Sequence, residues 1–410
     1  MLHLSLALRN LRRNLRRSLL TAAAVAVGLS LMLFTVTFQH GSYDMMIRSA
    51  ISAMAGHVVV QAPGWQQERD EALLVRDADA IQRDLQRALP DAIVIERVFL
   101  EGLLTSTQGS VGVSLEGVDP EGEGAVQDLP EQLIAGEWLD EDPRGLLIGA
   151  EMAETLQVEV GDKVVYMGQH LGHEVSSQMF RVRGVFKTGA AELDAFIAMA
   201  PLSATQELLG VPGAAHQISV HLDDARLSIH TADQVRGLLA GRDLEVLYWR
   251  EALPELYAFI QLDRSGGDLM LAVIGLIITL GVVNTMLMSV LERTRELGVL
   301  LSIGMRRERV GWMIVQEGFA LALIGTAGGV LGGLVLSWPV VTWGLDLGGA
   351  VGGESMEMGG AVMSSVLKGS WDPTRSAIYV LASVLITTAA SFYPAIRAAL
   401  LHPIDALRHS

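Results

Sequence analysis

Residues 269–291 read LMLAVIGLIITLGVVNTMLMSVL and contain no charged side chain. A helix needs roughly 20 mostly apolar residues to cross the ~30 Å hydrocarbon core of a bilayer. Three other stretches have the same character, so the sequence predicts an α-helical membrane protein with four transmembrane helices, at residues 19–42, 268–291, 311–338 and 376–397. Glu317 lies near one end of the third helix, and the centres of all four are uncharged, as the cost of burying a charge in lipid requires.

Arginine indicates which ends of these helices lie in the cytoplasm. Residues 1–18 hold five arginines and no acidic residue, and the link between the second and third helices holds five more. Arg397 and Arg408 follow the fourth helix. Four helices satisfy all three assignments, which predicts a multi-pass protein of the bacterial inner membrane with both termini cytoplasmic. The first apolar stretch exceeds the ~7–15 residues of a signal-peptide core, which favours an uncleaved anchor.

The segment 43–267 is acidic, with 36 acidic and 16 basic residues, and is therefore predicted to lie outside the cytoplasm. The whole chain of 410 residues carries a net charge of −16, which argues against a nucleic-acid partner because phosphates attract basic surfaces. Cysteine is absent, which excludes disulfides, thiolate metal sites and a cysteine nucleophile.

Short runs of β-forming residues alternate with helical patterns in this acidic segment, which predicts an α+β domain built as one body or as two subdomains. Strands are expected at residues 57–61, 92–99, 102–106, 111–118, 163–167, 180–186, 217–222 and 245–248. Helices are expected at residues 77–89, 150–156, 202–209 and 231–239.

No catalytic constellation emerges from the sequence, so we expect a protein that is not an enzyme. The tract Gln169-His170-Leu171-Gly172-His173-Glu174 is the one candidate for a metal site. It lacks the spacing of a zinc-binding helix, and a polar hairpin tip is the favoured interpretation. We therefore expect no metal and no cofactor bound by this chain.

Residues 292–310 form the cytoplasmic link between the second and third helices. Apolar and charged positions are interleaved in it, interrupted by Gly298 and Gly304, which predicts a short amphipathic helix. Such a helix offers an apolar ridge with a charged rim to another protein, although an interfacial connector held by arginines at the lipid headgroups is an equally good interpretation. The candidate docking residues are Glu292, Arg293, Arg295, Glu296, Leu297, Gly298, Leu301 and Gly304.

Two features of the apolar helices suggest helix packing. Gly325, Gly329 and Gly333 are spaced by four residues, and small residues at this spacing let a second helix approach closely. We expect them to pack against the second or fourth helix of the same chain, with a subunit interface as the alternative. Asn284 can hydrogen-bond a neighbouring helix. The loop 339–375 is rich in Trp and Met, which predicts anchoring at the membrane surface or contact with lipid chains.

Several motifs resemble those of the MacB/FtsX-like permeases of ABC transporters, most nearly the LolC/LolE lipoprotein-releasing type. The link Glu292-Arg293-Thr294-Arg295-Glu296-Leu297-Gly298, followed by Ser302-Ile303-Gly304, is similar to the family's cytoplasmic signature. The tail from Tyr393 to Arg408 resembles the family's closing motif, and residues 7–14 resemble its N-terminal elbow helix. Residues 136–210 resemble its periplasmic core domain.

The resemblance implies an elbow helix over residues 1–18, a periplasmic domain over 43–267, a coupling helix within 292–310 and a cytoplasmic tail over 398–410. It also implies a second permease, identical or different, and ATPase subunits that bind ATP and magnesium. The sequence has no Gly-x-x-x-x-Gly-Lys-Ser/Thr loop, so the ATPase is expected on a separate chain.

For the lipoprotein-releasing type, the substrates implied are lipoproteins or other amphiphiles, with membrane lipid and a periplasmic carrier as further partners. The alternative is an FtsX-like regulator, which relays ATPase cycling to a periplasmic hydrolase without transport.

Overall fold

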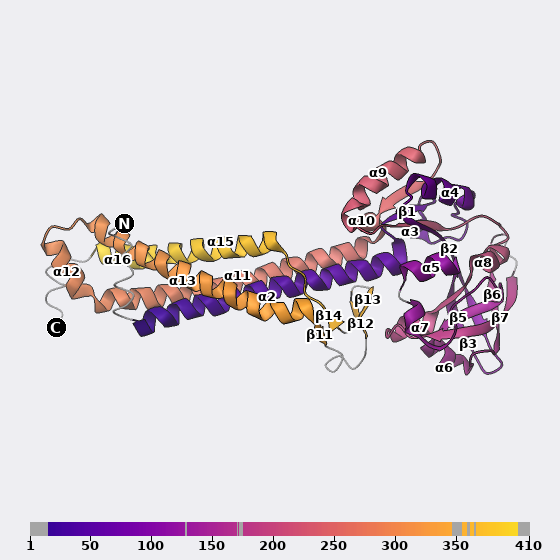
Figure 1. Ribbon diagram of the computed structural model, residues 1–410, viewed down its shortest axis with the longest axis horizontal. Coiled ribbons are helices and arrows are strands. Elements are labelled where there is room, and N and C mark those ends of the chain that lie inside the picture. Colours follow the sequence, from indigo (N-terminus) through magenta and orange to yellow (C-terminus); the bar gives the residue numbers. More distant parts are fainter. Residues whose placement is uncertain are drawn as a thin grey trace. The chain divides into compact units, whose positions relative to one another are not determined.

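The computed structural model describes residues 15–127, 129–169, 171, 175–346, 355–358, 361–364 and 366–400 (Figure 1). Two compact units make up the chain. The first comprises residues 1–44, 261–346 and 366–410, and the second comprises residues 45–260 and 347–365. Most of the expected elbow helix and most of the expected tail fall outside the described residues, as do His170, His173 and Glu174 of the candidate metal tract, and residues 15–18 begin the first long helix.

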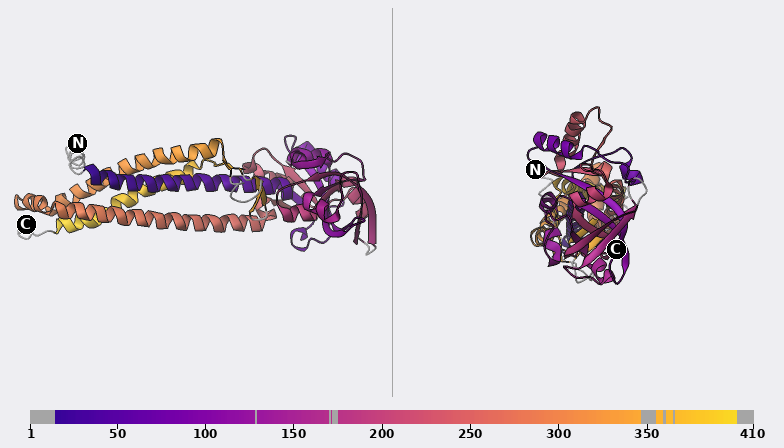
Figure 2. Two further views of the ribbon diagram at one scale, coloured as in Figure 1. Left: turned by 90° about the horizontal axis from the view of Figure 1, so that it is seen from below. Right: turned by 90° about the vertical axis from the view of Figure 1, so that its right-hand side faces the viewer.

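The first unit is built on helices long and apolar enough to cross a membrane, and four such helices lie in the described part of the chain. They run side by side in two perpendicular views (Figures 1 and 2). They belong to α2 (Leu15–Ala50), α11 (Pro254–Glu292), α13 (Arg307–Thr342) and α15 (Pro373–Ala390), the last followed by α16 (Phe392–Ala399). Helix α2 continues well beyond residue 42 and α11 begins well before residue 268, because apolarity marks the part of a helix that suits lipid and not where the helix ends.

The glycine row of α13 packs against α2. A methyl group added to Gly329 would lie 2.7 Å from Cβ of Leu29, and one added to Gly333 would lie 2.9 Å from Cβ of Leu33. Ser30 also donates a hydrogen bond from Oγ to the carbonyl of Gly329, at 3.0 Å. The glycines therefore face the first apolar helix, and the expectation that they face the second or fourth was wrong. Because residue numbers rise together on both helices, α2 and α13 are parallel, as the first and third of four alternating helices must be.

Polar contacts join α11 to α2 and α15 just before the apolar part of α11 begins. Tyr43 on α2 donates from its hydroxyl to Asp263 on α11, at 2.6 Å. Asp268 of α11 forms an ion pair with Arg375 of α15 and accepts a hydrogen bond from Tyr379 at 2.8 Å. Such contacts stabilise the arrangement of helices where water can still reach their ends.

The segment predicted as a loop over 339–375 begins as a continuation of α13, and its described residues then contain four short strands. They are β11 (Leu345–Asp346), β12 (Ser355–Met358), β13 (Ala361–Ser364) and β14 (Val366–Leu367), paired as β11 with β14 and β12 with β13. Trp343 and Trp371 are exposed, which suits either interpretation of this segment. The side chains of Met356, Met358 and Met363, on which the lipid-contact hypothesis depended, lie outside the described ones.

The second unit is organised by one mixed sheet, so the suggestion of two subdomains does not match its strand pairing. In the described residues the sheet has ten strands, in the order β10-β1-β9-β2-β3-β8-β5-β7-β4, with β6 paired to both β2 and β7. The strands are β1 (Val58–Gln61), β2 (Ile93–Thr105), β3 (Ser110–Val118), β4 (Leu133–Gly136), β5 (Gly145–Gly149), β6 (Lys163–Gln169), β7 (Val175–Phe186), β8 (Ile197–Pro201), β9 (Gln217–His221) and β10 (Glu245–Tyr248).

The main hydrophobic core joins one face of this sheet to amphipathic helices. Its helical members come from α4 (Ala78–Ala88), α6 (Ala150–Leu156), α8 (Leu202–Leu209) and α9 (Ser228–Leu238). In α4, for example, Ile81 and Leu85 are buried and lie four residues apart on one stripe. The four predicted helices of this domain are confirmed, because each has a strong apolar period and a clear turn at its end.

Several predictions for this domain were wrong or incomplete, and the strands β4, β5 and β8 and the short helices α3 (Trp65–Glu68) and α10 (Trp249–Ala252) were not predicted. The two strands expected at 92–99 and 102–106 are one continuous strand, β2, because Gly102 sits in the ladder opposite Val113 and the pairing continues through it. Short helices α5 (Pro120–Val126) and α7 (Ala191–Phe196) were missed. Asp119 caps α5 by accepting from the amide of Gly122, and Pro120 occupies its first turn, so an Asp-Pro helix start was readable there.

Glu96 on β2 points into the domain with only 2% of its surface exposed. Its two carboxyl oxygens have no hydrogen-bond partner among the described residues. Burial, together with the nearby carboxyl groups of Asp79 and Asp119, raises the pKa of Glu96 to about 8, although Arg83 opposes the shift. The folded chain therefore holds a proton on Glu96 at neutral pH that the unfolded chain releases.

We expect this proton to make the domain less stable as pH rises. The pKa of Glu96 in the folded chain lies above its value of about 4.5 in the unfolded chain. The stability that the protonated side chain contributes is therefore fully present below pH 4.5 and is lost as pH rises through about 8. The Glu96→Gln variant should lose less melting temperature between pH 5 and pH 9 than the wild type, as measured by circular dichroism on the full chain in detergent. The exposed control Glu121→Gln should follow the wild type. Parallel pH profiles for Glu96→Gln and the wild type would contradict the assignment.

Candidate functional site

The candidate site is the turn that joins α11 to α13. Helix α12 (Thr294–Ser302) starts after Arg293 and ends in a turn at Gly304, whose φ of +97° favours glycine. The amide of Met305 donates to the carbonyl of Leu300 at 3.0 Å, and the amide of Gly304 donates to that of Leu301 at 3.1 Å. This pair of bonds is a Schellman motif, which satisfies the last carbonyls of a helix. The predicted amphipathic helix thus forms, with Gly304 as its stop.

Helix α12 has an inner face that packs on the rest of its unit. Leu297 is only 2% exposed and Gly298 is buried. Leu297 belongs to a buried cluster with residues of α11 and α13, namely Met286, Val290, Val310 and Ile314, and Leu300 and Leu301 pack against its edge. Burial of this apolar stripe fixes α12 on the two long helices.

The outer face of α12 is exposed and mixed in character. Glu292, Arg295 and Glu296 are exposed, and Val299 and Ile303 lie beside them. Ile303 is 78% exposed, which is unusual for an aliphatic side chain in a helical turn. A shallow depression on this face is lined by Arg295, Glu296, Val299 and Leu300. An apolar ridge rimmed by charges of both signs suits contact with another protein.

A largely buried ion pair joins the start of α12 to α13. Nη1 of Arg293 lies 3.1 Å from Oε2 of Glu317, with 15% and 10% of the two side chains exposed. Nε of Arg293 lies 3.4 Å from Oε2 of Glu296, so the guanidinium also contacts the outer face. Apolar side chains of Met286, Val290, Leu297 and Ile314 line the same small hollow. The pair therefore links the exposed rim of α12 to the interior of the helix bundle.

The structure divides the predicted docking residues into two groups. Glu292, Arg295, Glu296 and Gly304 are exposed and accessible to a partner. Arg293, Leu297 and Gly298 face inward, and Leu301 is half-buried, so these four position α12 instead of lining its outer face. Val299 and Ile303 are also exposed but were not among the predicted docking residues, because the sequence shows which positions are apolar but not which apolar stripe the bundle covers.

Glu317 was also missed as a functional residue, although the sequence signalled it as a charge at the end of an apolar helix. A charge in an apolar helix is normally paired, and the partner of Glu317 is Arg293, which lies 24 positions earlier in the chain. Asn284 lies on an exposed part of α11. Its predicted role in helix packing therefore stays a prediction.

No group of three or more His, Asp or Glu side chains is arranged to hold a metal ion among the residues that the structure describes.

Comparison with known proteins gives matches along nearly all of the chain. Residues 18–238 match the MacB-like periplasmic core domain, and residues 269–403 match the FtsX-like permease C-terminal family. The lipoprotein-releasing system transmembrane protein LolC of Xylella fastidiosa (strain 9a5c) is 24% identical, over 98% of this chain and 97% of its own length. The macrolide export ATP-binding/permease protein MacB of Nitrobacter winogradskyi is 29% identical, over 64% of this chain and 38% of its own length.

Among solved structures, the periplasmic region of MacB from Actinobacillus actinomycetemcomitans matches 49% of this chain and 93% of its own, at 16% identity and a TM-score of 0.35.

Proposed function

This chain belongs to the FtsX-like permeases that carry a MacB-like periplasmic core domain, and from that premise we propose that it couples a separate cytoplasmic ATPase to the movement of lipoproteins or other amphiphiles. It is an ABC transporter permease of the LolC/LolE/MacB type. In the proposal it spans the inner membrane four times, with both termini in the cytoplasm and the ten-stranded sheet in the periplasm. A second permease completes the transporter.

The observation that carries the proposal is the two-sided construction of α12. Its outer face presents Val299 and Ile303 within a charged rim, and its inner face is attached to α11 and α13. A force applied by an ATPase to such a helix passes to two long helices through Leu297 and the Arg293–Glu317 ion pair. An interfacial connector would not need this attachment, because lipid headgroups alone would hold its arginines.

We expect Ile303→Asp to abolish binding of the ATPase. The substitution places a charge on the apolar ridge, and the apolar core of an interface is normally depleted of acidic residues. The permease should remain folded, because Ile303 is 78% exposed. Copurification of the ATPase with tagged permease, followed by ATP hydrolysis in proteoliposomes, measures the effect.

The matched control for this experiment is Ile229→Asp, which alters another exposed isoleucine, on α9 of the other unit. It should leave ATPase binding and hydrolysis unchanged. Normal ATPase binding by Ile303→Asp would remove the docking role of α12.

The substrate is tested by reconstituting the permease and its ATPase with a fluorescent triacylated lipoprotein in vesicles. ATP-dependent loss of the lipoprotein from the bilayer to a soluble acceptor is expected. The name of the LolC relative supports this choice of probe. Vigorous ATP hydrolysis while the lipoprotein stays in the bilayer would contradict transport of this class and favour the regulatory alternative.

A further inference from the structure

The first long helix ends in an unusual turn inside the second unit. Helix α2 runs to Ala50 and continues as a single π-helical turn, η1 (Ile51–Ala55). The amide of Gly56 donates to the carbonyl of Ile51 at 2.7 Å, which closes this turn, and Gly56 has a φ of +69°. Every helix leaves its last carbonyls without partners in the helix. At the end of α2 those carbonyls point at a buried arginine.

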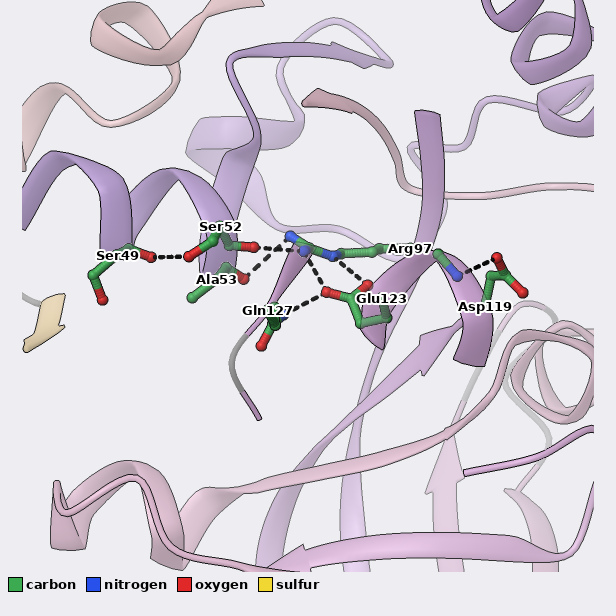
Figure 3. A network of polar contacts seen from close by, with 8 residues as sticks. Ser49, Ser52, Ala53, Arg97, Asp119, Glu123 and Gln127 are labelled. Atoms are coloured by element: carbon green, nitrogen blue, oxygen red, sulfur yellow. Dashed lines mark hydrogen bonds and ion pairs between the residues drawn. The ribbon is translucent and has the colours of Figure 1, made fainter. Parts of the chain in front are cut away.

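That arginine is Arg97, which lies on β2 near the middle of the sheet and is completely buried. Figure 3 shows its polar contacts with Ser52, Ala53 and Glu123. Its Nη2 donates to the carbonyl of Ser52 at 2.9 Å, and its Nη1 donates to the carbonyl of Ala53 at 3.1 Å. The other edge of the guanidinium meets the carboxylate of Glu123, with Nε donating to Oε2 at 3.1 Å and Nη2 pairing with Oε1. One side chain thus joins a helix end, a strand and helix α5.

Glu123 is held in place by two features of its own helix. The cap at Asp119 fixes the start of α5, and the side-chain amide of Gln127, one turn further on, donates to Oε1 of Glu123. The side chain of Glu123 is fully buried. The position of the Glu123 carboxylate is therefore fixed, and it orients the guanidinium of Arg97 toward the carbonyls of Ser52 and Ala53.

Polar side chains continue from Arg97 across the sheet. In the strand register Arg97 lies opposite Gln217 of β9, which lies opposite Gln61 of β1, and Glu245 of β10 follows. Gln217 donates to Gln61 at 3.2 Å, and Gln61 donates to Glu245 at 3.2 Å. The same row thus places polar side chains on four neighbouring strands, although apolar residues of similar volume could be at least as stable there.

We propose that Arg97 is the positioning residue that makes the end of α2 and the ten-stranded sheet move as one body. A buried ion pair of this kind adds little net stability compared with an apolar substitute. It does fix the orientation of the helix end relative to β2, because the planar guanidinium binds a carboxylate on one edge and two carbonyls on the other. Displacement of α2 is then passed directly to β2 and the strands paired with it. The inference rests on the proposed function for its biological role, but the rigid joint itself can be measured separately.

The test uses the full chain and the double variant Arg97→Met/Glu123→Gln, which removes both charges and keeps an acceptor for Gln127. Because the sequence has no cysteine, spin labels can be placed at Arg48→Cys on α2 and Glu151→Cys on α6, both of which are exposed. In the wild type we expect one narrow distance peak, and in the double variant we expect that peak to be lost. Hydrogen exchange at the amide of Gly56 should be about tenfold faster in the variant, as loss of charged hydrogen bonds predicts.

The matched control is Arg183→Met/Glu137→Gln in the same domain. Arg183 also pairs with a carboxylate and donates to a backbone carbonyl, that of Trp138, but it holds no part of α2. It should keep the narrow peak and the slow exchange. The single variant Arg97→Lys should give an intermediate result. Its ammonium group keeps the charge but lacks the planar fork with which the guanidinium contacts a carboxylate and two carbonyls at once.

The two proposals fail in different ways. A narrow peak and unchanged exchange in Arg97→Met/Glu123→Gln, with the domain folded, would overturn the role of Arg97 whatever the transporter moves. In the reconstituted transporter, the wild-type peak should persist with and without ATP and vanadate, and the double variant should hydrolyse ATP normally but lose lipoprotein release. If the wild type itself releases no lipoprotein while the joint measurements hold, then the proposed substrate fails and the joint stands. If the folded variant shows wild-type release, transmission through Arg97 is refuted.

Discussion

Replacing Glu317 with alanine is expected to produce the largest loss of stability among single substitutions in the helical unit. The change removes one partner of an ion pair in which Arg293 is 15% exposed and Glu317 is 10% exposed. Breaking a buried pair from one side costs about 3–5 kcal/mol, because the remaining charge is left without compensation. The guanidinium of Arg293 would then lie among Met286 and Leu297 with Glu296 as its remaining ion-pair partner. Unfolding of the purified chain in detergent, followed by tryptophan fluorescence, measures the shift.

Two further variants separate the ion pair from a general effect of charge. Arg295→Ala removes an exposed arginine of α12 and should leave the unfolding midpoint unchanged. The double variant Arg293→Met/Glu317→Met should recover most of the lost stability, because apolar residues of similar volume replace the pair. We still expect ATP hydrolysis to be uncoupled from transport in this double variant, since Arg293 also contacts Glu296 on the outer face. If Glu317→Ala unfolds at the wild-type midpoint, the pair contributes nothing and the attachment of α12 rests on Leu297 alone.

Replacing Gly329 with leucine should separate α2 from α13. Even the first carbon of a new side chain would lie 2.7 Å from Cβ of Leu29, and that carbon belongs to a buried side chain beside the helix backbone. Overpacking of this kind costs about 1–3 kcal/mol or more, and here it would also break the bond from Ser30 to the carbonyl of Gly329. The loss should appear as a lower midpoint of thermal aggregation in detergent and as a smaller yield of folded protein.

The matched control is Gly281→Leu on α11, also within an apolar helix. Nothing in the described structure lies within 4 Å of a carbon added at Gly281. This substitution should leave the midpoint unchanged or raise it slightly, because leucine is the better helix former. Equal destabilisation by both substitutions would mean that helix propensity, and not the α2–α13 contact, sets the effect.

Much of the architecture was predictable because it depends on local sequence. Twenty apolar residues in a row make a helix that suits lipid whatever surrounds them, so the four long helices could be found from composition. Helices such as α6 and α8 were predicted to the residue, since their apolar period and their stop signals lie within a few positions of each other. The family resemblance was carried by short motifs in the right order, and the matches over residues 18–238 and 269–403 confirm it.

Other features depended on residues far apart in the chain. A helix that is apolar on all sides does not reveal which side meets lipid and which meets a neighbour, so the partner of Gly325, Gly329 and Gly333 was misassigned. For the same reason the covered and open stripes of α12 were not distinguished, and Arg293 and Leu297 were grouped with residues that face outward.

The four lipid-compatible helices, the acidic α+β segment and the short amphipathic link could be inferred from the order of residues alone, because each is a property of neighbouring residues. The pairing of Glu317 with Arg293 and the contact of Arg97 with the end of α2 became visible only in the folded chain. Arg97 lies 44 and 45 positions from its carbonyl partners, and a charged residue in a strand reads the same whether it is solvated or buried. Burial and pairing are set by what the folded chain brings beside a residue, and no local pattern contains that information.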